Sequence, residues 1–135
     1  MTSTVTIPNR LLDLLKPETR AFAYLALIRS DGTPHVTPIW FDFDGQNFIF
    51  NTARGRVKDR IMHRHPVVSF VIADPHDPYR YVQVTGPVIS ETEEGGRDQI
   101  NRLNQKYQGN PNYPLRAGEV RVTYKVQPQH IAPQQ

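Results

Sequence analysis

Three basic side chains stand close together at the end of a predicted β-strand. They are Arg54, Arg56 and Lys58, separated by Gly55 and Val57. Gly55 frees the backbone to turn, and the residues that follow have helical spacing. Cationic side chains at the start of a helix make a place for an anion, most simply a phosphate. The three residues could therefore bind an anion, but basic residues such as Arg56 and Lys58 taken in isolation are more often part of a solvated turn, and Arg54 could equally point to water.

The other residue types argue against several alternative chemistries. The chain has no cysteine, which excludes disulfides, thiolate metal sites and cysteine nucleophiles. His63 and His65 are two positions apart, so they do not share the face that a helical zinc pair requires, and we expect no metal site. No acidic pair suits a glycosidase, and no glycine-rich nucleotide loop is present. Of the five histidines, only His35 lies where it could touch a ligand.

Two predicted strands position the basic residues. Asp31-Gly32 and Asp44-Gly45 are turn signals, and aromatic and β-branched residues follow each of them. We expect strands at residues 35–43 and 47–53, joined as one hairpin. The second strand then delivers the chain directly to the basic residues.

Alternation along the first of these strands separates its two faces. Val36, Pro38 and Trp40 share the face opposite to His35. Pro38 cannot donate a ladder hydrogen bond, so it belongs at an edge, at a bulge or beside a ligand. Trp40 could either fill the core or line a ligand pocket.

The rest of the chain predicts a mainly β domain with short peripheral helices. Further strands are expected at 21–29, 67–73, 79–84, 88–90 and 120–126, and helices at 11–15, 57–63 and 93–107. A proline-containing loop is expected at 74–78, a capping box at Ser90 and Glu93, and a loose tail from Gln127. About six strands without βαβ order predict a six-stranded antiparallel barrel, with residues 1–135 as one domain.

Composition narrows the class of partner and the compartment. The 135 residues carry a formal net charge of +3, which suits an anionic ligand. The basic residues are not gathered in one run or helix face, so we expect no nucleic-acid partner. The N-terminal residues lack a signal-peptide pattern, and no apolar run approaches the roughly 20 residues that span a bilayer. We expect a cytoplasmic protein without a membrane partner.

These residues resemble the split β-barrel flavin and deazaflavin oxidoreductases, the superfamily that includes pyridoxamine 5'-phosphate oxidase. The closer resemblance is to the branch that uses the deazaflavin coenzyme F420. The similarity runs in order from about residue 10 to residue 128. Its matching segments are 31–41, 51–58, 66–68, 74–75, 77–82, Gly86 and 100–107.

The resemblance implies a split barrel that forms a homodimer, with two cofactors at the subunit interface. It assigns the cofactor phosphate to Arg56 and Lys58. It places two strands beside the cofactor ring, and their residues are Thr37, Pro38, Ile39, Asn51, Thr52 and Ala53. It also implies a segment that reaches across from the second subunit, formed by Tyr79 and Arg80. The residues that bind substrate phosphate in true pyridoxamine-phosphate oxidases have no match here, so that substrate is not expected.

The implied function is hydride transfer between coenzyme F420 and a small organic acceptor. FMN in the same pocket is the alternative, because the two cofactors share a ring and a phosphate and differ chiefly in the anionic tail. A non-catalytic protein that binds a flavin or haem is a third reading. The cofactor would supply the reactive atom. The sequence names no catalytic side chain.

Overall fold

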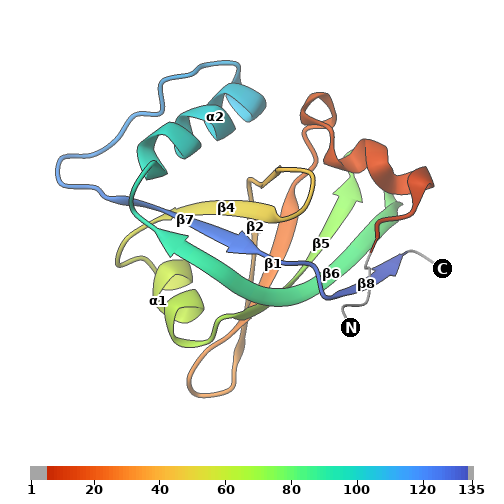
Figure 1. The fold of residues 1–135 in the computed structure, drawn as a ribbon, viewed down its shortest axis with the longest axis horizontal. Coiled ribbons are helices and arrows are strands. Elements are labelled where there is room, and N and C mark those ends of the chain that lie inside the picture. The colour runs from red at the N-terminus through yellow and green to blue at the C-terminus, as the bar shows by residue number, and fades with distance from the viewer. Residues whose placement is uncertain (1–5, 134–135) are drawn as a thin grey trace.

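The computed structural model describes residues 6–133, which form an antiparallel β-sheet with short helices around it (Figure 1). The strands are β1 (Ala23–Ile28), β2 (Pro34–Ile39), β3 (Asp42–Phe43), β4 (Phe48–Ala53), β5 (Val67–Asp74), β6 (Asp77–Thr92), β7 (Arg121–Val126) and β8 (His130–Pro133). The helices are the 3-10 segments η1 (Asn9–Leu15) and η2 (Pro17–Thr19), and the α-helices α1 (Val57–Arg64) and α2 (Gly96–Gln108).

The sheet is a barrel that stays open along one side, which makes it a split barrel. Its strand order is β2-β1-β5-β6-β7-β4-β3, with β8 added beside β6. The 16-residue strand β6 joins the two halves of the barrel, one containing β5 and the other β7. It pairs with β5 up to Pro87 and with β7 from Val88. A side chain at Gly86 would meet the backbone oxygen of Gln127 at 1.8 Å, so only glycine lets the chain pass here.

The expected hairpin of residues 35–43 with 47–53 is wrong. β2 pairs with β1 along its whole length, and only the two residues of β3 pair with β4. The chain leaves the ladder at Trp40, whose ring stacks on Tyr107 of α2. Phe41 then donates its backbone N–H to the Tyr107 hydroxyl instead of to a strand. The Asp31-Gly32 turn is a hairpin turn, but it joins β1 to β2.

Eight strands are found in residues 6–133, where a six-stranded barrel was expected, and the separately expected strands 79–84 and 88–90 are the single strand β6. β3 is a two-residue fragment, and β8 lies in the tail that was expected to be loose. Residues 130–133 pair with β6 and continue its ladder. The proline-containing loop is also tighter than expected, because β5 and β6 pair up to Asp74 and Asp77 and leave only two residues between them.

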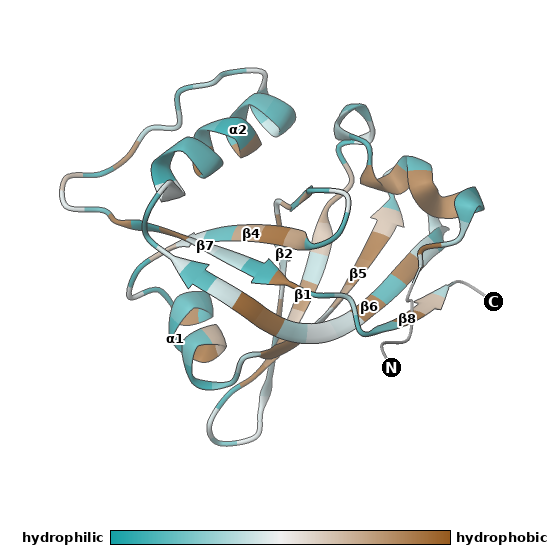
Figure 2. Ribbon diagram, viewed as in Figure 1, coloured by the Kyte–Doolittle hydropathy of each residue, from teal (hydrophilic) through white to brown (hydrophobic). Residues whose placement is uncertain are grey.

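The core is built by the alternation that the strands predict. The inward residues of β1 are buried and its outward residues are exposed, and β4 is buried throughout. Phe70 packs edge-to-face with both Phe48 and Phe50 near the centre. Figure 2 shows apolar residues concentrated on strands such as β4 and β5 and on η1, whereas α2 is mostly polar.

Helix α2 covers the outer side of β4 and β7 (Figure 1). Its residues Ile100 and Leu103 are buried beneath it, as helical spacing predicted. The expected capping box is wrong, because Ser90 remains in β6 and the helix begins after Gly95, whose φ is 75°. No helix within residues 6–133 is both long and apolar enough to cross a membrane.

Candidate functional site

The end of β4 and the start of α1 bring basic side chains to one hollow. Arg56 is the N-cap residue of α1 and Lys58 lies in its first turn. β2 runs past the same place and contributes His35. The hollow has a volume of about 410 Å³, and the residues lining it are His35, Thr52, Gly55, Arg56, Val57, Lys58 and Arg60. We call it the phosphate hollow, because it joins the two cations that the sequence singled out.

The electrostatics of the phosphate hollow favour an anion. Burial, followed by the charge of Arg56, lowers the pKa of Lys58. Burial, followed by the charges of Arg29 and Lys58, lowers the pKa of His35. Within residues 6–133 Lys58 has no acidic partner, and Arg56 approaches only Glu119, at 3.8 Å. A bound phosphate would relieve this unbalanced positive charge.

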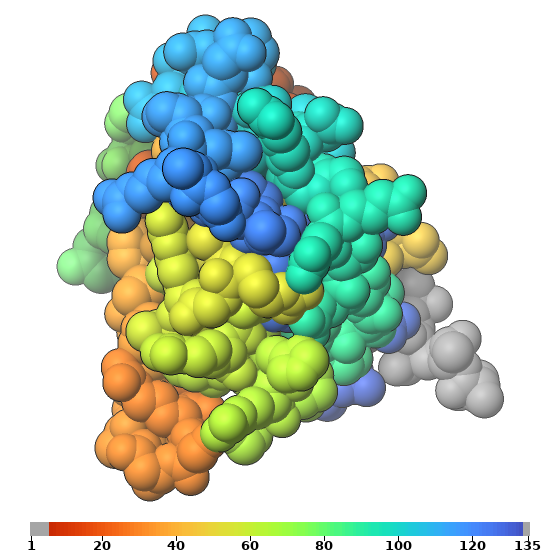
Figure 3. Space-filling model, turned by 90° about the vertical axis from the view of Figure 1, so that its left-hand side faces the viewer, coloured from red at the N-terminus to blue at the C-terminus, as the bar shows by residue number. Residues whose placement is uncertain are grey.

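A second hollow continues the positive charge around α1. It has a volume of about 360 Å³ and shares Val57 and Arg60 with the phosphate hollow. Its remaining lining residues are Arg29, Ser30, Ile61, Arg64 and His65. Figure 3 shows α1 at the middle of this face, between the β1–β2 turn in orange and the loop after α2 in blue. We define the basic face as Arg29, Arg56, Lys58, Arg60 and Arg64.

Arg54 differs from the other cations because its charge is already neutralised. Its guanidinium contacts Asp59 at 2.9 Å, Glu91 at 2.6 Å and Glu93 at 3.0 Å. These carboxylates raise the pKa of Arg54 further, Glu91 most strongly. The alternative that Arg54 points simply to water is therefore wrong, and Arg54 is not available to a phosphate either.

Asp59 links this acidic group to the loop that carries Arg56. It is 3 % exposed and accepts a hydrogen bond from the backbone N–H of Gly55 at 2.7 Å. The hydroxyl of Tyr124 donates to the same carboxylate at 2.5 Å. Burial, together with Asp59, raises the pKa of Tyr124, so this hydroxyl keeps its proton. The buried carboxylate thus holds the turn between β4 and α1 against the barrel.

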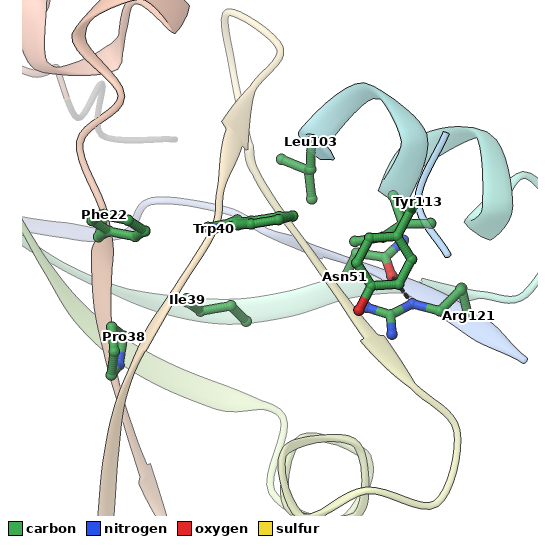
Figure 4. A pocket seen from close by; sticks show the side chains of 9 residues that line it. Phe22, Pro38, Ile39, Trp40, Asn51, Leu103, Tyr113 and Arg121 are labelled. Carbon is green, nitrogen blue, oxygen red and sulfur yellow. Dashed lines mark hydrogen bonds between the residues drawn. The ribbon is translucent and has the colours of Figure 1, made fainter. Parts of the chain in front are cut away.

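An aromatic pocket lies between β2, β4 and α2 (Figure 4). It has a volume of about 330 Å³, and its lining residues are Phe22, Pro38, Ile39, Trp40, Asn51, Ile100, Leu103, Tyr113 and Arg121. Its walls are mostly apolar or aromatic, with the polar side chain of Asn51 and one charged side chain, Arg121, among them. A flat conjugated ring suits such a lining.

One side of the aromatic pocket is held by a stack of three rings. Tyr107 stacks on Phe22 at 5.3 Å and on Trp40 at 5.1 Å between ring centroids. The Tyr107 hydroxyl also donates to the backbone oxygen of Ala21 at 2.6 Å. Trp40 therefore lines a pocket, which was one of the two readings of its position, and it is fixed there by α2.

The opposite side of the aromatic pocket holds a buried arginine. Arg121 is 6 % exposed, and its Nε donates to Asn51 Oδ1 at 2.8 Å. Its Nη1 donates to Glu119 at 2.8 Å, and this bond holds the pKa of that carboxyl below its usual value. The ring of Tyr113 covers the guanidinium at 5.1 Å. Asn51 in turn donates to the Gly96 backbone oxygen, which ties β4 to α2.

β2 and β4 carry most of the residues that were expected beside a cofactor ring. Pro38, Ile39 and Asn51 line the aromatic pocket, and Thr52 lines the phosphate hollow. Thr37 lies on β2 between these regions, and its buried hydroxyl has no partner within residues 6–133. The buried Nδ1 of His35 is likewise unpaired. Such orphaned polar atoms along one strand suit a polar ligand.

Three of the expected site residues lie elsewhere. Ala53 is buried at the end of β4 and lines neither the aromatic pocket nor the phosphate hollow. Tyr79 lies near the start of β6, just after the β5–β6 turn, and is 78 % exposed. Arg80 is engaged within its own subunit, where it contacts Asp13 at 2.6 Å and Asp74 at 2.7 Å. The expectation that Tyr79 and Arg80 reach a partner subunit stays a prediction.

Phe22, Tyr113 and Arg121 line the aromatic pocket although the sequence did not indicate them as site residues. Of these three residues only Arg121 could have been recognised from the sequence, because it is a charged residue at the start of a strand with an alternating pattern of core positions. Tyr113 lies in a loop, and nothing local indicates what its ring covers. No group of three or more potential metal ligands is found in residues 6–133.

Known proteins of similar structure and sequence identify the class of protein to which this chain belongs. The fold is the split barrel of flavin-type oxidoreductases, and a solved structure of an F420 reductase matches it with a TM-score of 0.83. The two sequences are 32 % identical, over 93 % of this chain and 98 % of the other. The profile of the pyridoxamine 5'-phosphate oxidase family matches residues 11–134. The chain belongs to that family, and the matches point to a flavin- or deazaflavin-type cofactor.

More distant structures share the fold alone. A pyridoxamine 5'-phosphate oxidase-like protein from Listeria innocua is 17 % identical, with a TM-score of 0.69, over 93 % of this chain and 95 % of that one. A protein from Bacteroides thetaiotaomicron, described as a 5-nitroimidazole antibiotic resistance protein, is 14 % identical with a TM-score of 0.66. That match covers 94 % of this chain and 82 % of the other. No curated protein matches the sequence.

Proposed function

We propose that this protein is a cytoplasmic oxidoreductase that uses coenzyme F420 to reduce a small organic acceptor. The observation that carries the proposal is the basic face beside the aromatic pocket. One phosphate would be held by Arg56 and Lys58, but the phosphate hollow also contains Arg60, and Arg29 and Arg64 lie in the adjoining hollow. These three arginines have no acidic partner in residues 6–133. The F420 cofactor has an anionic tail beyond its phosphate, and FMN does not. The likeness to the F420 reductase supports the same choice.

The residues present fit such a cofactor. Arg56 and Lys58 would hold the phosphate through charge-assisted hydrogen bonds. The unpaired Thr37 hydroxyl on β2 would hydrogen-bond a polar group of the cofactor. The apolar walls formed by Ile39 and Trp40 would exclude water from the reacting face. When bound, the cofactor ring supplies the hydride chemistry.

The proposal includes a homodimer, because one face of the sheet is apolar and exposed. Pairing of β1 with β2 and β5 puts the outward residues of these strands on one surface. We call it the outer apolar face, and its members are Tyr24, Ile28, Pro34, Val36, Pro38, Val67 and Val71. Pro38 also lines the aromatic pocket, so a second copy seated here would adjoin the cofactor.

A cofactor titration tests the proposal. Purified protein is titrated with F420 and with FMN, each followed by the cofactor's own fluorescence. We expect tight binding of F420 and weaker binding of FMN. Tighter binding of FMN, or yellow protein with a band near 450 nm, would assign the same pocket to FMN instead. Binding without turnover of any acceptor would make the protein a carrier.

A further inference from the structure

Arg121 is a buried cation with an unused hydrogen-bonding edge inside an apolar pocket. Its Nε and Nη1 are taken by Asn51 and Glu119, whereas Nη2 has no partner within residues 6–133. The side chain cannot swing away, because Tyr113 covers one face of the guanidinium and Asn51 is itself anchored to Gly96. Arg121 is also the only charged residue among those that line the aromatic pocket.

The surroundings of Arg121 specify what it can bind. Glu119 already balances its charge, so the pocket does not require a second full anion. A neutral oxygen, such as a ring carbonyl, can still accept a charge-assisted hydrogen bond from Nη2. The opposite wall offers the flat rings of Phe22 and Trp40, as Figure 4 shows. The ligand should therefore be flat and apolar, with an oxygen acceptor at one edge.

We infer that Arg121 is a specificity-determining residue, which selects a flat conjugated ligand by donating a hydrogen bond to an oxygen atom on the ring edge. The inference rests on the proposed function only for the identity of the molecule that carries this ring. The oxygen belongs either to the cofactor ring or to the acceptor molecule, and both present the same chemistry to Arg121.

A matched ligand pair isolates this hydrogen bond. Fluorenone and fluorene are flat tricyclic molecules that differ by one carbonyl oxygen. Their binding is followed by the fluorescence of Trp40, the only tryptophan of the chain, which lines the pocket. We expect the wild type to bind fluorenone at least about tenfold more tightly than fluorene. Equal binding of the two by the wild type would overturn the inference, whether or not any variant folds.

Variants then assign the preference to the guanidinium. Arg121→Met is combined with Glu119→Gln, because Arg121→Met alone would leave the buried carboxylate of Glu119 with only the distant contact to Arg56 at 3.8 Å. Glu119→Gln alone is the matched control and should keep the preference for fluorenone. In the double variant the two ligands should bind within about twofold of each other. A preference that survives in a folded double variant would contradict the inference.

A competition experiment identifies the source of the oxygen. If saturating F420 displaces fluorenone, Arg121 holds the cofactor ring. If fluorenone still binds with F420 present, Arg121 holds the acceptor. Both results support the inference. A protein that binds neither F420 nor FMN would end the proposed function, yet the fluorenone comparison would still decide the role of Arg121.

Discussion

At the scale of single residues, the charge around Lys58 is the feature that separates this site from an ordinary solvated turn. Burial and Arg56 lower the pKa of Lys58, and no carboxylate within residues 6–133 pairs with it. A cation held in this way is stabilised when an anion binds, because the anion replaces the hydration that burial removes. The functional role of the residue can therefore be measured as ligand affinity.

Removing both phosphate-site cations should weaken cofactor binding. We expect Arg56→Ala combined with Lys58→Ala to cost about 3 to 6 kcal/mol of F420 binding, since each of the two charge-assisted bonds contributes roughly 1.5 to 3 kcal/mol. Titration by F420 fluorescence measures the loss. Lys16→Ala with Arg97→Ala removes the same charge from exposed positions outside both hollows and should leave affinity unchanged. Unaltered affinity in the first variant would refute the assigned role.

Lys106 gives a prediction about pH. Burial lowers its pKa to about 8, and its ammonium group donates to the Phe41 backbone oxygen at 2.7 Å. In the unfolded chain the pKa lies near 10.4. Between these values the unfolded state binds more protons, so this group adds stability as pH rises from 8 to about 10.

The comparison variant for Lys106 is Lys106→Met, which removes the titrating group. Thermal unfolding at pH 7.5 and at pH 10 should show the wild type gaining in Tm relative to the variant at the higher pH. Lys16→Met, at an exposed position, serves as the control. A Tm difference between wild type and Lys106→Met that stays constant with pH would contradict the lowered pKa.

At the scale of elements, the turn between β4 and α1 depends on a single buried carboxylate. Asp59 accepts hydrogen bonds from Gly55, Arg54 and Tyr124. Gly55 itself has a φ of 92°, a conformation that favours glycine. The phosphate hollow is therefore shaped in part by Asp59, which does not line it.

Loss of the Asp59 carboxylate should destabilise the fold and loosen the hollow. We expect Asp59→Asn to lower the free energy of unfolding by roughly 3 kcal/mol. The new amide group would place its N–H groups beside the hydrogen-bond donors that now surround the carboxylate, and Arg54 would lose one of its carboxylate partners. Urea unfolding measures this change. Tyr124→Phe removes one hydroxyl only and should cost about 1 to 2 kcal/mol. A smaller loss for Asp59→Asn than for Tyr124→Phe would argue against this arrangement.

At the scale of the whole molecule, the outer apolar face is the feature that a single copy leaves unexplained. Val36 and Val67 are each 62 % exposed, and Ile28 is 54 % exposed. Monomeric proteins seldom expose connected apolar patches of this kind across several strands. The open edge strand β2 lies in the same surface, beside the aromatic pocket.

A charge placed on the outer apolar face should therefore separate the proposed dimer. We expect Val36→Lys to shift the protein from dimer to monomer in analytical ultracentrifugation, because burying an unpaired ammonium group is costly. Leu12→Lys, at an exposed apolar position on η1, is the control and should leave the assembly intact. A wild type that sediments as a monomer would remove the homodimer from the proposal.

The local features of this protein could be predicted from its residue pattern. Strand alternation, the turns at Asp31-Gly32 and Asp44-Gly45, and the cations after β4 are all found where the residue pattern places them. Each depends on neighbours within a few positions, so backbone preference and side-chain period are sufficient to predict it. The family resemblance added the split barrel, which the fold confirms.

Which segments meet in space is set by long-range packing, and it could not be predicted from the residue pattern. β2 pairs with β1 rather than with β4, Arg54 contacts Glu91 and Glu93 from 37 and 39 positions away, and Arg121 reaches Asn51 across 70 positions. From sequence alone, residues 35–53 are equally consistent with a hairpin, Arg54 with a phosphate ligand and Arg121 with an ordinary strand residue. Local preferences do not distinguish these outcomes, because the free energy that separates them comes from packing between segments distant in sequence.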